Sequence, residues 1–245
     1  MQSDLSDRQQ KILNAIINEF QHSAEPVGSR SIAKNYLPDL SPATIRNEMA
    51  DLEDDGFITQ PHTSAGRIPT DHGYRFYVNR LMHTSPPTRK EEEQIKHAVR
   101  QSAEDLDSIL HQTARLLSHA LDYTAVVVNL GQHKRIFSSG AVNLLHQPEF
   151  RDLAHMQKML ELFEEEELLA EIVDECFLPN EINIRIGAEN KHKIIKDCSV
   201  VVSSYAVGHE NIGRIGIIGP TRMYYSKTTS LVSCVAKELS KVLNF

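Results

Sequence analysis

The stretch from Ser41 to Arg67 constrains the fold of this chain more than any other. It reads SPATIRNEMADLEDDGFITQPHTSAGR. Ser41 is a typical helix N-cap residue, and Pro42 suits the first helical position, where its missing N–H costs nothing. The apolar residues that follow are spaced along one helix face: Ile45, Met49 and Leu52. Gly56 is typical of the position just past a helix C-terminus, and a short apolar strand follows it. The stretch therefore predicts a capped helix followed by a small β-hairpin.

Two more helices are predicted upstream of this stretch. The first covers residues 5–20, with Ser6 as its N-cap and one amphipathic apolar face. A turn over residues 24–28 leads to a short second helix, which Ser29 is expected to cap and Pro38 to end. Three helices with short connections, followed by a hairpin, predict a winged helix-turn-helix.

The exposed face of the third helix carries side chains that suit contact with DNA bases. Arg46 can make a bidentate contact to guanine, and Asn47 can do so to adenine. The acidic residues come later along this helix, away from the end that a major groove would accept. The predicted base-reading set is Ser41, Ala43, Thr44, Arg46 and Asn47. The alternative is a solvated helix with ordinary polar surface groups.

The start of the second helix and the hairpin are predicted to contact the DNA backbone. Ser29 and Arg30 lie where the second helix would meet phosphates. In the hairpin, His62, Ser64 and Arg67 suit a wing that reaches phosphate or a minor groove. The alternative for Arg67 is an exposed hairpin charge without a DNA contact.

Composition limits how such contacts can arise. The 245 residues carry a formal net charge of −7, which excludes a globally basic nucleic-acid binder. Any DNA contact must therefore come from a local basic surface, helped by helix N-termini. The three cysteines are odd in number and widely spaced, which favours a reducing cytoplasm over a disulfide scaffold. Because no apolar run is long enough to span a membrane and no signal-peptide pattern is found, we expect a cytoplasmic protein.

The remainder of the chain has both helical and strand patterns, which predicts an α+β class. A helix with aromatic side chains, capped by Thr70 or Asp71, is expected to pack on the winged domain or on a second copy of it. Residues 83–90 contain Pro86-Pro87 and indicate a linker. A helical pattern covers 91–122, with Ser102 as a candidate break, and further helices are expected over 151–176 and from Ser226 or Thr228 onward. Strands are expected over 124–130, 182–186, 199–205 and 212–218. The predicted divisions are a DNA-binding domain over 1–84, a linker and the start of a connecting helix over 85–100, and a second domain over 101–245.

No catalytic or metal-binding constellation is found in the sequence. Gly213, Gly216 and Gly219 lack the spacing of a dinucleotide-binding loop, so hairpin and strand-end positions explain them better. The 12 histidines form no zinc-type pattern, and the acidic run at 164–167 favours a solvated helix face over a paired-carboxylate site. We therefore expect no enzyme activity, no cofactor and no metal site.

Several long motifs resemble those of one bacterial family. In the first domain they are PVGSR at 26–30, the run from Ser41 to Thr70, and GYRFYVNRL at 73–81. Farther along they are SGAVNLLHQPEFRDL at 139–153, KDCSVVVSSYAVG at 196–208 and GRIGIIGPTRMYYSKTTSLV at 213–232. On these motifs the chain resembles the HrcA family, the bacterial heat-inducible transcription repressors.

The resemblance implies properties that the residues alone do not give. Family members bind an inverted-repeat operator, called CIRCE, ahead of chaperone genes. A GAF-like domain follows their DNA-binding domain and carries an inserted dimerisation domain. The GroE chaperonin keeps the repressor in its active form, and repression falls when unfolded proteins occupy the chaperonin during heat stress. The resemblance thus implies a homodimer whose other partners are double-stranded DNA and a GroE-type chaperonin.

The chain departs from the family pattern in one place. Between the strand at 124–130 and Arg135 it has only a few residues, where family members usually carry a much longer segment. That segment normally holds further strands of the GAF-like domain and much of the inserted domain. We therefore expect a GAF-like α+β domain that is shortened in its middle, for which the usual dimer interface cannot be assumed.

Two other classes of function are weighed against an operator-binding repressor. A small-molecule-sensing winged-helix regulator would need a formed apolar pocket with convergent polar groups in its second domain. An enzyme that uses the winged domain for docking would need a catalytic constellation, which the sequence does not show. We therefore predict a dimeric repressor of chaperone genes, and the ligand-sensing regulator is the alternative.

Overall fold

The chain divides into two compact units, Met1–His83 and Thr84–Phe245, each with its own buried core. The structure is a computed structural model, and the residues it describes are 5–63, 65–101, 105–131, 134–179, 181–208 and 210–244. None of the helices within these ranges combines the length and the apolar character that crossing a membrane requires.

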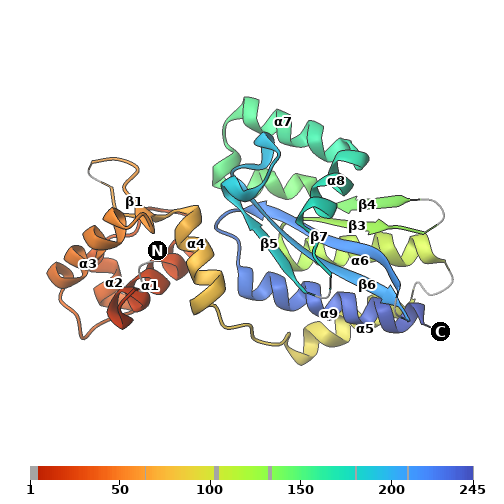
Figure 1. Ribbon diagram of the computed structural model, residues 1–245, viewed down its shortest axis with the longest axis horizontal. Helices are drawn as coiled ribbons and strands as arrows, with labels where there is room; N and C mark the ends of the chain where they lie inside the picture. The colour runs from red at the N-terminus through yellow and green to blue at the C-terminus, as the bar shows by residue number, and fades with distance from the viewer. Residues whose placement is uncertain are drawn as a thin grey trace. The chain divides into compact units, whose positions relative to one another are not determined.

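The first unit is a winged helix-turn-helix, as the sequence predicts (Figure 1). Its three helices are α1 (Asp7–Ser23), α2 (Ser29–Asn35) and α3 (Pro42–Asp54). The wing strands β1 (Ile58–Thr59) and β2 (Ile68–Pro69) pair antiparallel. The next helix, α4 (Asp71–Phe76), continues into a π-helical turn, Tyr77–Leu81.

Capping explains the ends of α3, as predicted. The Ser41 hydroxyl accepts a hydrogen bond from the Thr44 N–H at 3.0 Å, and Pro42 occupies the first helical position. Gly56 has a φ of 78°, a left-handed conformation that favours glycine just past a helix.

The predicted cap of α2 is wrong. Gly28 is the N-cap residue, and Ser29 is the first residue of the helix. The Ser29 side chain makes no capping hydrogen bond and is buried. Glycine is itself an acceptable N-cap, so the helix starts one residue earlier than a hydroxyl cap would place it.

The aromatic helix after the wing packs within the first unit. Tyr74 and Tyr77 are buried, and the rings of Phe57 and Phe76 meet edge to face with centroids 5.3 Å apart. Gly73 lets α4 approach the wing closely, because a Cβ at this position would lie 2.1 Å from the Phe57 carbonyl oxygen. The prediction that these aromatics pack on the winged domain is confirmed.

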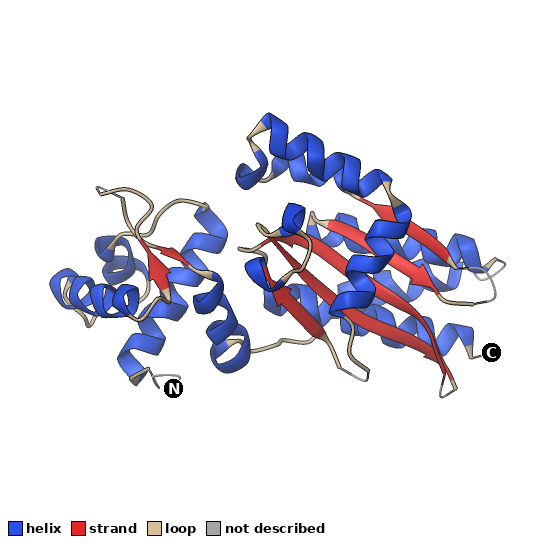
Figure 2. Cartoon of the chain, turned by 45° about the horizontal axis from the view of Figure 1, so that its top comes forward, coloured by secondary structure: helices blue, strands red, loops and turns tan. Residues whose placement is uncertain are grey.

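The second unit contains a five-stranded antiparallel sheet in the order β4-β3-β7-β6-β5 (Figure 2). Its strands are β3 (Thr124–Asn129), β4 (Arg135–Ser139), β5 (Asn183–Ile186), β6 (Cys198–Val207) and β7 (Glu210–Pro220). Every residue of β3 is buried, because the strand lies inside the sheet with both of its faces covered.

Helices lie over both faces of this sheet (Figures 1 and 2). On one face are α6 (Leu106–Leu121) and α9 (Tyr225–Leu243), and α5 (Arg89–Gln101) packs against both of these helices. On the other face are α7 (Leu153–Glu164) and α8 (Glu166–Cys176). The second unit is thus an α+β domain, the class that the sequence predicts, whereas its GAF-like character remains what the family resemblance implies.

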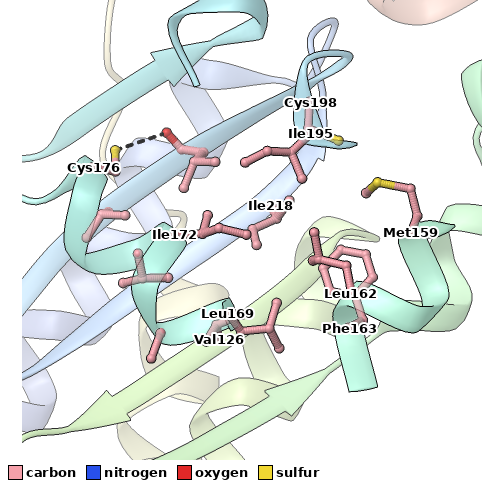
Figure 3. Close-up of a cluster of buried hydrophobic side chains, with 14 of the residues drawn as sticks. Val126, Met159, Leu162, Phe163, Leu169, Ile172, Cys176, Ile195, Cys198 and Ile218 are labelled. Carbon is pink, nitrogen blue, oxygen red and sulfur yellow. Dashed lines mark hydrogen bonds between the residues drawn. The ribbon is translucent and has the colours of Figure 1, made fainter. Parts of the chain in front are cut away.

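The core beneath α7 and α8 joins both helices to the sheet (Figure 3). Phe163 of α7 and Ile172 of α8 belong to one buried cluster with Val126 and Val128, which are alternate residues of β3 and so face the same side of the sheet. The buried Cys176 thiol donates to the Val200 carbonyl oxygen, with the two atoms 3.6 Å apart. The last turns of α8 are therefore fixed against β6.

The glycines of β7 are strand positions, as the sequence favoured. A Cβ at Gly216 would lie 2.5 Å from a Val173 methyl group, and one at Gly213 would lie 2.1 Å from the Tyr205 ring. Neighbouring side chains fill the space above these glycines.

One predicted helix is two helices. The pattern over 151–176 continues without Pro or Gly, yet α7 ends at Glu164 and α8 begins at Glu166. Glu165 between them has φ −93° and ψ 91°, an extended conformation. The bend lets both helices bury their apolar faces against the same sheet, which a single straight helix would not do.

The shortened middle of the domain closes as a hairpin. β3 and β4 are adjacent and antiparallel, with Asn129 opposite Arg135. Residues 130–134 join them, of which 132 and 133 lie outside the described residues. The sheet therefore continues from one strand to the other without the longer segment that the family usually carries.

Candidate nucleic-acid interface

The first two turns of α3 present the predicted base-reading residues. Ser41, Ala43, Arg46 and Asn47 are exposed and Thr44 is half-buried. The hydroxyls of Ser41 and Thr44 lie 2.9 Å apart and hold the start of the helix in place. The side chains of Arg46 and Asn47 make no hydrogen bond or ion pair with any described residue, so both are available to a ligand.

The opposite face of α3 fixes its orientation in the domain. Ile45 and Leu52 are fully buried, and Met49 is nearly so. Glu48, the first acid of the helix, forms an ion pair with Arg8 of α1 at 3.1 Å. This pair partly neutralises the acid nearest to the base-reading residues.

The N-terminus of α2 presents Arg30 and not Ser29. The Arg30 side chain is exposed and has no partner among the described residues, whereas Ser29 is 8% exposed. Of the two predicted phosphate contacts on this helix, Arg30 is thus the one whose side chain reaches solvent.

The base of the wing is joined to the start of α2. The backbones of Val27 and Arg67 exchange two hydrogen bonds, of 2.8 and 2.9 Å. Gly66 permits this approach, because a Cβ there would lie 2.4 Å from the Val27 carbonyl oxygen. The Gln60 amide donates to the carbonyls of Thr63 and Ala65, both at 3.0 Å, and so braces the wing loop. Sequence reasoning did not identify Gln60, since a lone amide in a loop carries no signal of its partners.

Of the three predicted wing residues, the structure describes His62 and Arg67. His62 is exposed, and Ser64 lies outside the described residues. The Arg67 guanidinium lies 2.7 Å from a Glu53 carboxylate oxygen of α3, and the two side chains are 21% and 30% exposed. The alternative of a freely exposed charge at Arg67 is therefore wrong. Sequence reasoning missed Glu53, because nothing in the local pattern pairs a residue late in α3 with the wing.

These elements enclose one groove of about 430 Å³. It is lined by Arg30 from α2, Arg46 and Met49 from α3, and Thr63 and Arg67 from the wing, among others. Three predicted arginines from different elements therefore come together at one surface of the first unit. Since Glu53 is paired with Arg67, the uncompensated positive charge of the groove comes from Arg30 and Arg46. This is the local basic surface that an acidic chain needs for contact with DNA.

Comparison with protein families decides the assignment. The model of the HrcA winged helix-turn-helix transcription repressor, DNA-binding domain, matches residues 4–81, and the model of the HrcA C-terminal domain matches residues 88–229. The chain belongs to the HrcA family. Its first unit is thus the DNA-binding winged helix of a transcription repressor family, as the sequence motifs implied.

Individual relatives agree with this assignment. The chain is 33% identical to the heat-inducible transcription repressor HrcA of Pelotomaculum thermopropionicum, over 98% of this chain and 97% of that protein. It is 34% identical to the HrcA of Natranaerobius thermophilus, with the same shares covered. A crystal structure of a hypothetical protein at 2.2 Å superposes with a TM-score of 0.80 over 98% of this chain and 99% of that one. At 21% identity, that match supports the fold alone.

The chain is shorter than its relatives. The alignment with the Pelotomaculum HrcA spans 337 positions, whereas this chain has 245 residues. Many positions of that relative therefore have no counterpart here, although nearly all of this chain is matched. The chain is a shortened member of the HrcA family, as its sequence predicted.

Proposed function

We propose that this protein represses heat-shock chaperone genes by binding the inverted-repeat CIRCE operator as a dimer. The observation that carries the proposal is the groove in which α2, α3 and the wing bring Arg30 and Arg46 together. Both side chains are exposed and free of partners among the described residues. An HrcA-family DNA-binding domain with this surface ready for contact supports sequence-specific recognition.

We expect the elements that line the groove to contact different parts of the DNA. The first turns of α3 would enter the major groove, where Arg46 and Asn47 read base edges. Arg30 at the start of α2 would contact phosphate, and the wing would follow the backbone beside it. Because the chain carries a net charge of −7, non-specific attraction to DNA is weak, and base contacts must supply most of the preference.

A two-fold dimer fits an inverted repeat, because it would place two copies of α3 about one turn of DNA apart or a multiple of it. The family resemblance further supports release from the operator during heat stress and a GroE-type chaperonin that maintains the active form. The operator DNA and the chaperonin both belong to the bacterial cytoplasm, where we place the protein. Since the chain is shorter than its relatives, its dimer contact must form from surfaces that it retains.

Fluorescence anisotropy with labelled duplexes tests this proposal. The full chain is titrated with the CIRCE inverted repeat and with a scrambled duplex of the same composition, at two salt concentrations, with and without chaperonin. We expect strong preference for the repeat, with chaperonin raising the fraction of protein that binds. Equal weak binding to both duplexes, unimproved by chaperonin, would reject the repressor function for this shortened chain.

One observation favours the ligand-sensing alternative. A cavity of about 800 Å³ lies in the second unit, bordered by α5, α6 and the 3-10 turn Ala141–His146. Its lining mixes apolar side chains such as Ile95 with polar ones such as Arg115 and Gln112. Thermal unfolding in the presence of metabolite pools would identify a ligand through a raised midpoint. Unchanged midpoints would leave operator binding as the better account.

A further inference from the structure

The second unit contains a cluster of metal-ligating side chains that its sequence does not reveal. Glu171 and Glu175 lie one turn apart on α8, and His192 lies in the connection between β5 and β6. One ligand atom from each, two carboxylate oxygens and an imidazole nitrogen, lie within 4.8 Å of one another. The sequence indicates no metal site here, because the histidine comes from a different element and its spacing from the two glutamates matches no known metal-binding pattern.

The elements that carry these ligands are held in place independently. The inner face of α8 is fixed in the core by Ile172 and Cys176, and the Cys176 thiol is hydrogen-bonded to β6 (Figure 3). The connection that carries His192 is organised around Asn190. The Asn190 amide donates to the carbonyls of Gly187, Ile195 and Cys198, at 3.0, 3.3 and 2.9 Å. The ligands thus project from supports that need no rearrangement.

The charges in the cluster are incompletely balanced. Two carboxylates one helical turn apart repel each other. The Lys191 ammonium lies 3.2 Å from a Glu175 carboxylate oxygen, but neither the Glu171 carboxylate nor the His192 imidazole has a hydrogen bond or ion pair with a described residue. Arg185 donates to the Glu175 backbone carbonyl and not to a carboxylate of the cluster. The Lys191 side chain is 67% exposed and can move away when another cation takes its place.

We propose that Glu171, Glu175 and His192 bind a divalent transition-metal ion, with Zn²⁺ as the best match. One imidazole and two carboxylates form a borderline donor set that suits zinc, and water would complete a tetrahedral site. Ligand distances of about 2.0–2.2 Å place ligand atoms about 3.3 Å apart, so small side-chain rotations would close the site. The bound ion would join α8 to the β5–β6 connection. This metal site does not depend on the DNA-binding function proposed above.

Zinc titration of the full chain by isothermal calorimetry tests the site, with thermal unfolding in zinc and in EDTA as a second readout. We expect one equivalent to bind and zinc to raise the unfolding midpoint by roughly 4 °C or more. His192→Ala and Glu171→Gln should each weaken binding at least about tenfold. His119→Ala is the matched control, since His119 is an exposed histidine of α6 outside the cluster, and it should bind zinc like the wild type.

A variant that should bind zinc more tightly tests the proposal even if His192→Ala or Glu171→Gln folds poorly. Lys191→Met removes the cation that now pairs with Glu175, so it should bind zinc more tightly than the wild type. Circular dichroism in EDTA establishes that each variant is folded before metal is added. Wild-type affinity in folded His192→Ala, or no change in the wild-type unfolding midpoint with zinc, would overturn the proposal.

Discussion

The Arg67 guanidinium at the base of the wing lies 2.7 Å from the Glu53 carboxylate late in α3. The Arg67 Nε atom is buried and has no hydrogen-bond partner among the described residues. The pair ties the wing to the helix that we propose reads the operator. It also means that a DNA phosphate would compete with Glu53 for Arg67.

Removing Glu53 should therefore strengthen DNA binding. Glu53→Gln frees Arg67 for phosphate and removes one negative charge, so affinity should rise on operator and scrambled duplexes alike. The slope of log affinity against log salt concentration should steepen by about one unit, as expected for one more phosphate contact.

Arg67→Ala should weaken binding to both duplexes equally and lower that salt slope by about one unit. If Glu53→Gln instead weakens binding as much as Arg67→Ala, the pair positions the wing and Arg67 does not contact phosphate.

Arg46 should act on specificity. Arg46→Ala removes a side chain that can pair with guanine, so it should cost about 1–3 kcal/mol on the operator and little on scrambled DNA. Anisotropy titrations at one salt concentration measure both. Arg30→Ala is the matched comparison, because an exposed phosphate-contacting arginine in the same groove should weaken both duplexes similarly. Equal losses from the two variants on both duplexes would contradict the assigned roles.

Gly66 should be essential to the wing. In Gly66→Ala the new Cβ would lie 2.4 Å from the Val27 carbonyl oxygen, so the wing must shift away from α2. We expect about 1–3 kcal/mol of destabilisation of the first unit, together with weakened DNA binding. Gly28→Ala is the comparison: its φ is −93° and no atom lies within 4 Å of an added Cβ, so it should lose only the preference for glycine over alanine at the N-cap of α2, about 1 kcal/mol or less. Denaturant unfolding that ranks the two variants alike would show that the Val27–Arg67 contact is unimportant.

Stability at high pH should depend on Tyr123. Burial raises the pKa of its hydroxyl to about 12, against an opposing hydrogen bond from the Tyr224 N–H. Below about pH 10 the phenol is neutral in both the folded and the unfolded chain, so its contribution is fully present there. As pH rises from about 10 to 12, the unfolded chain ionises first, and about 3 kcal/mol of stability is lost. Tyr123→Phe should reduce this loss in denaturant unfolding at pH 9 and 11; an unchanged loss would contradict the prediction.

Local signals were sufficient to predict the winged domain. Ser41, Pro42 and Gly56 act on the backbone within a few residues of themselves, so the limits of α3 follow from the sequence. Four of the five strands described in the second unit were also predicted, β3 most directly, because its unbroken apolar run reflects burial on both faces. Strand β4 was not predicted from the sequence.

Contacts between distant residues could not be predicted in the same way. The pairing of Arg67 with Glu53 and the approach of His192 to Glu171 depend on the tertiary fold. The bend at Glu165 had no sequence signal, because no Pro or Gly interrupts the helical pattern there. Ser29 was misassigned as a cap because its hydroxyl suits that role, whereas the fold buries it and leaves the role to Gly28.

We propose that two copies of α3 read the two halves of an inverted repeat. The most direct measurement compares binding of the full chain to the CIRCE repeat with binding to the same repeat carrying about five extra base pairs between its halves. That insertion turns the half-sites to opposite sides of the helix, since one turn of DNA is about 10 base pairs. We expect tight binding of two chains to the natural spacing and a large loss of affinity on the lengthened repeat. Equal affinity for the two spacings, or one chain bound per repeat, would contradict it.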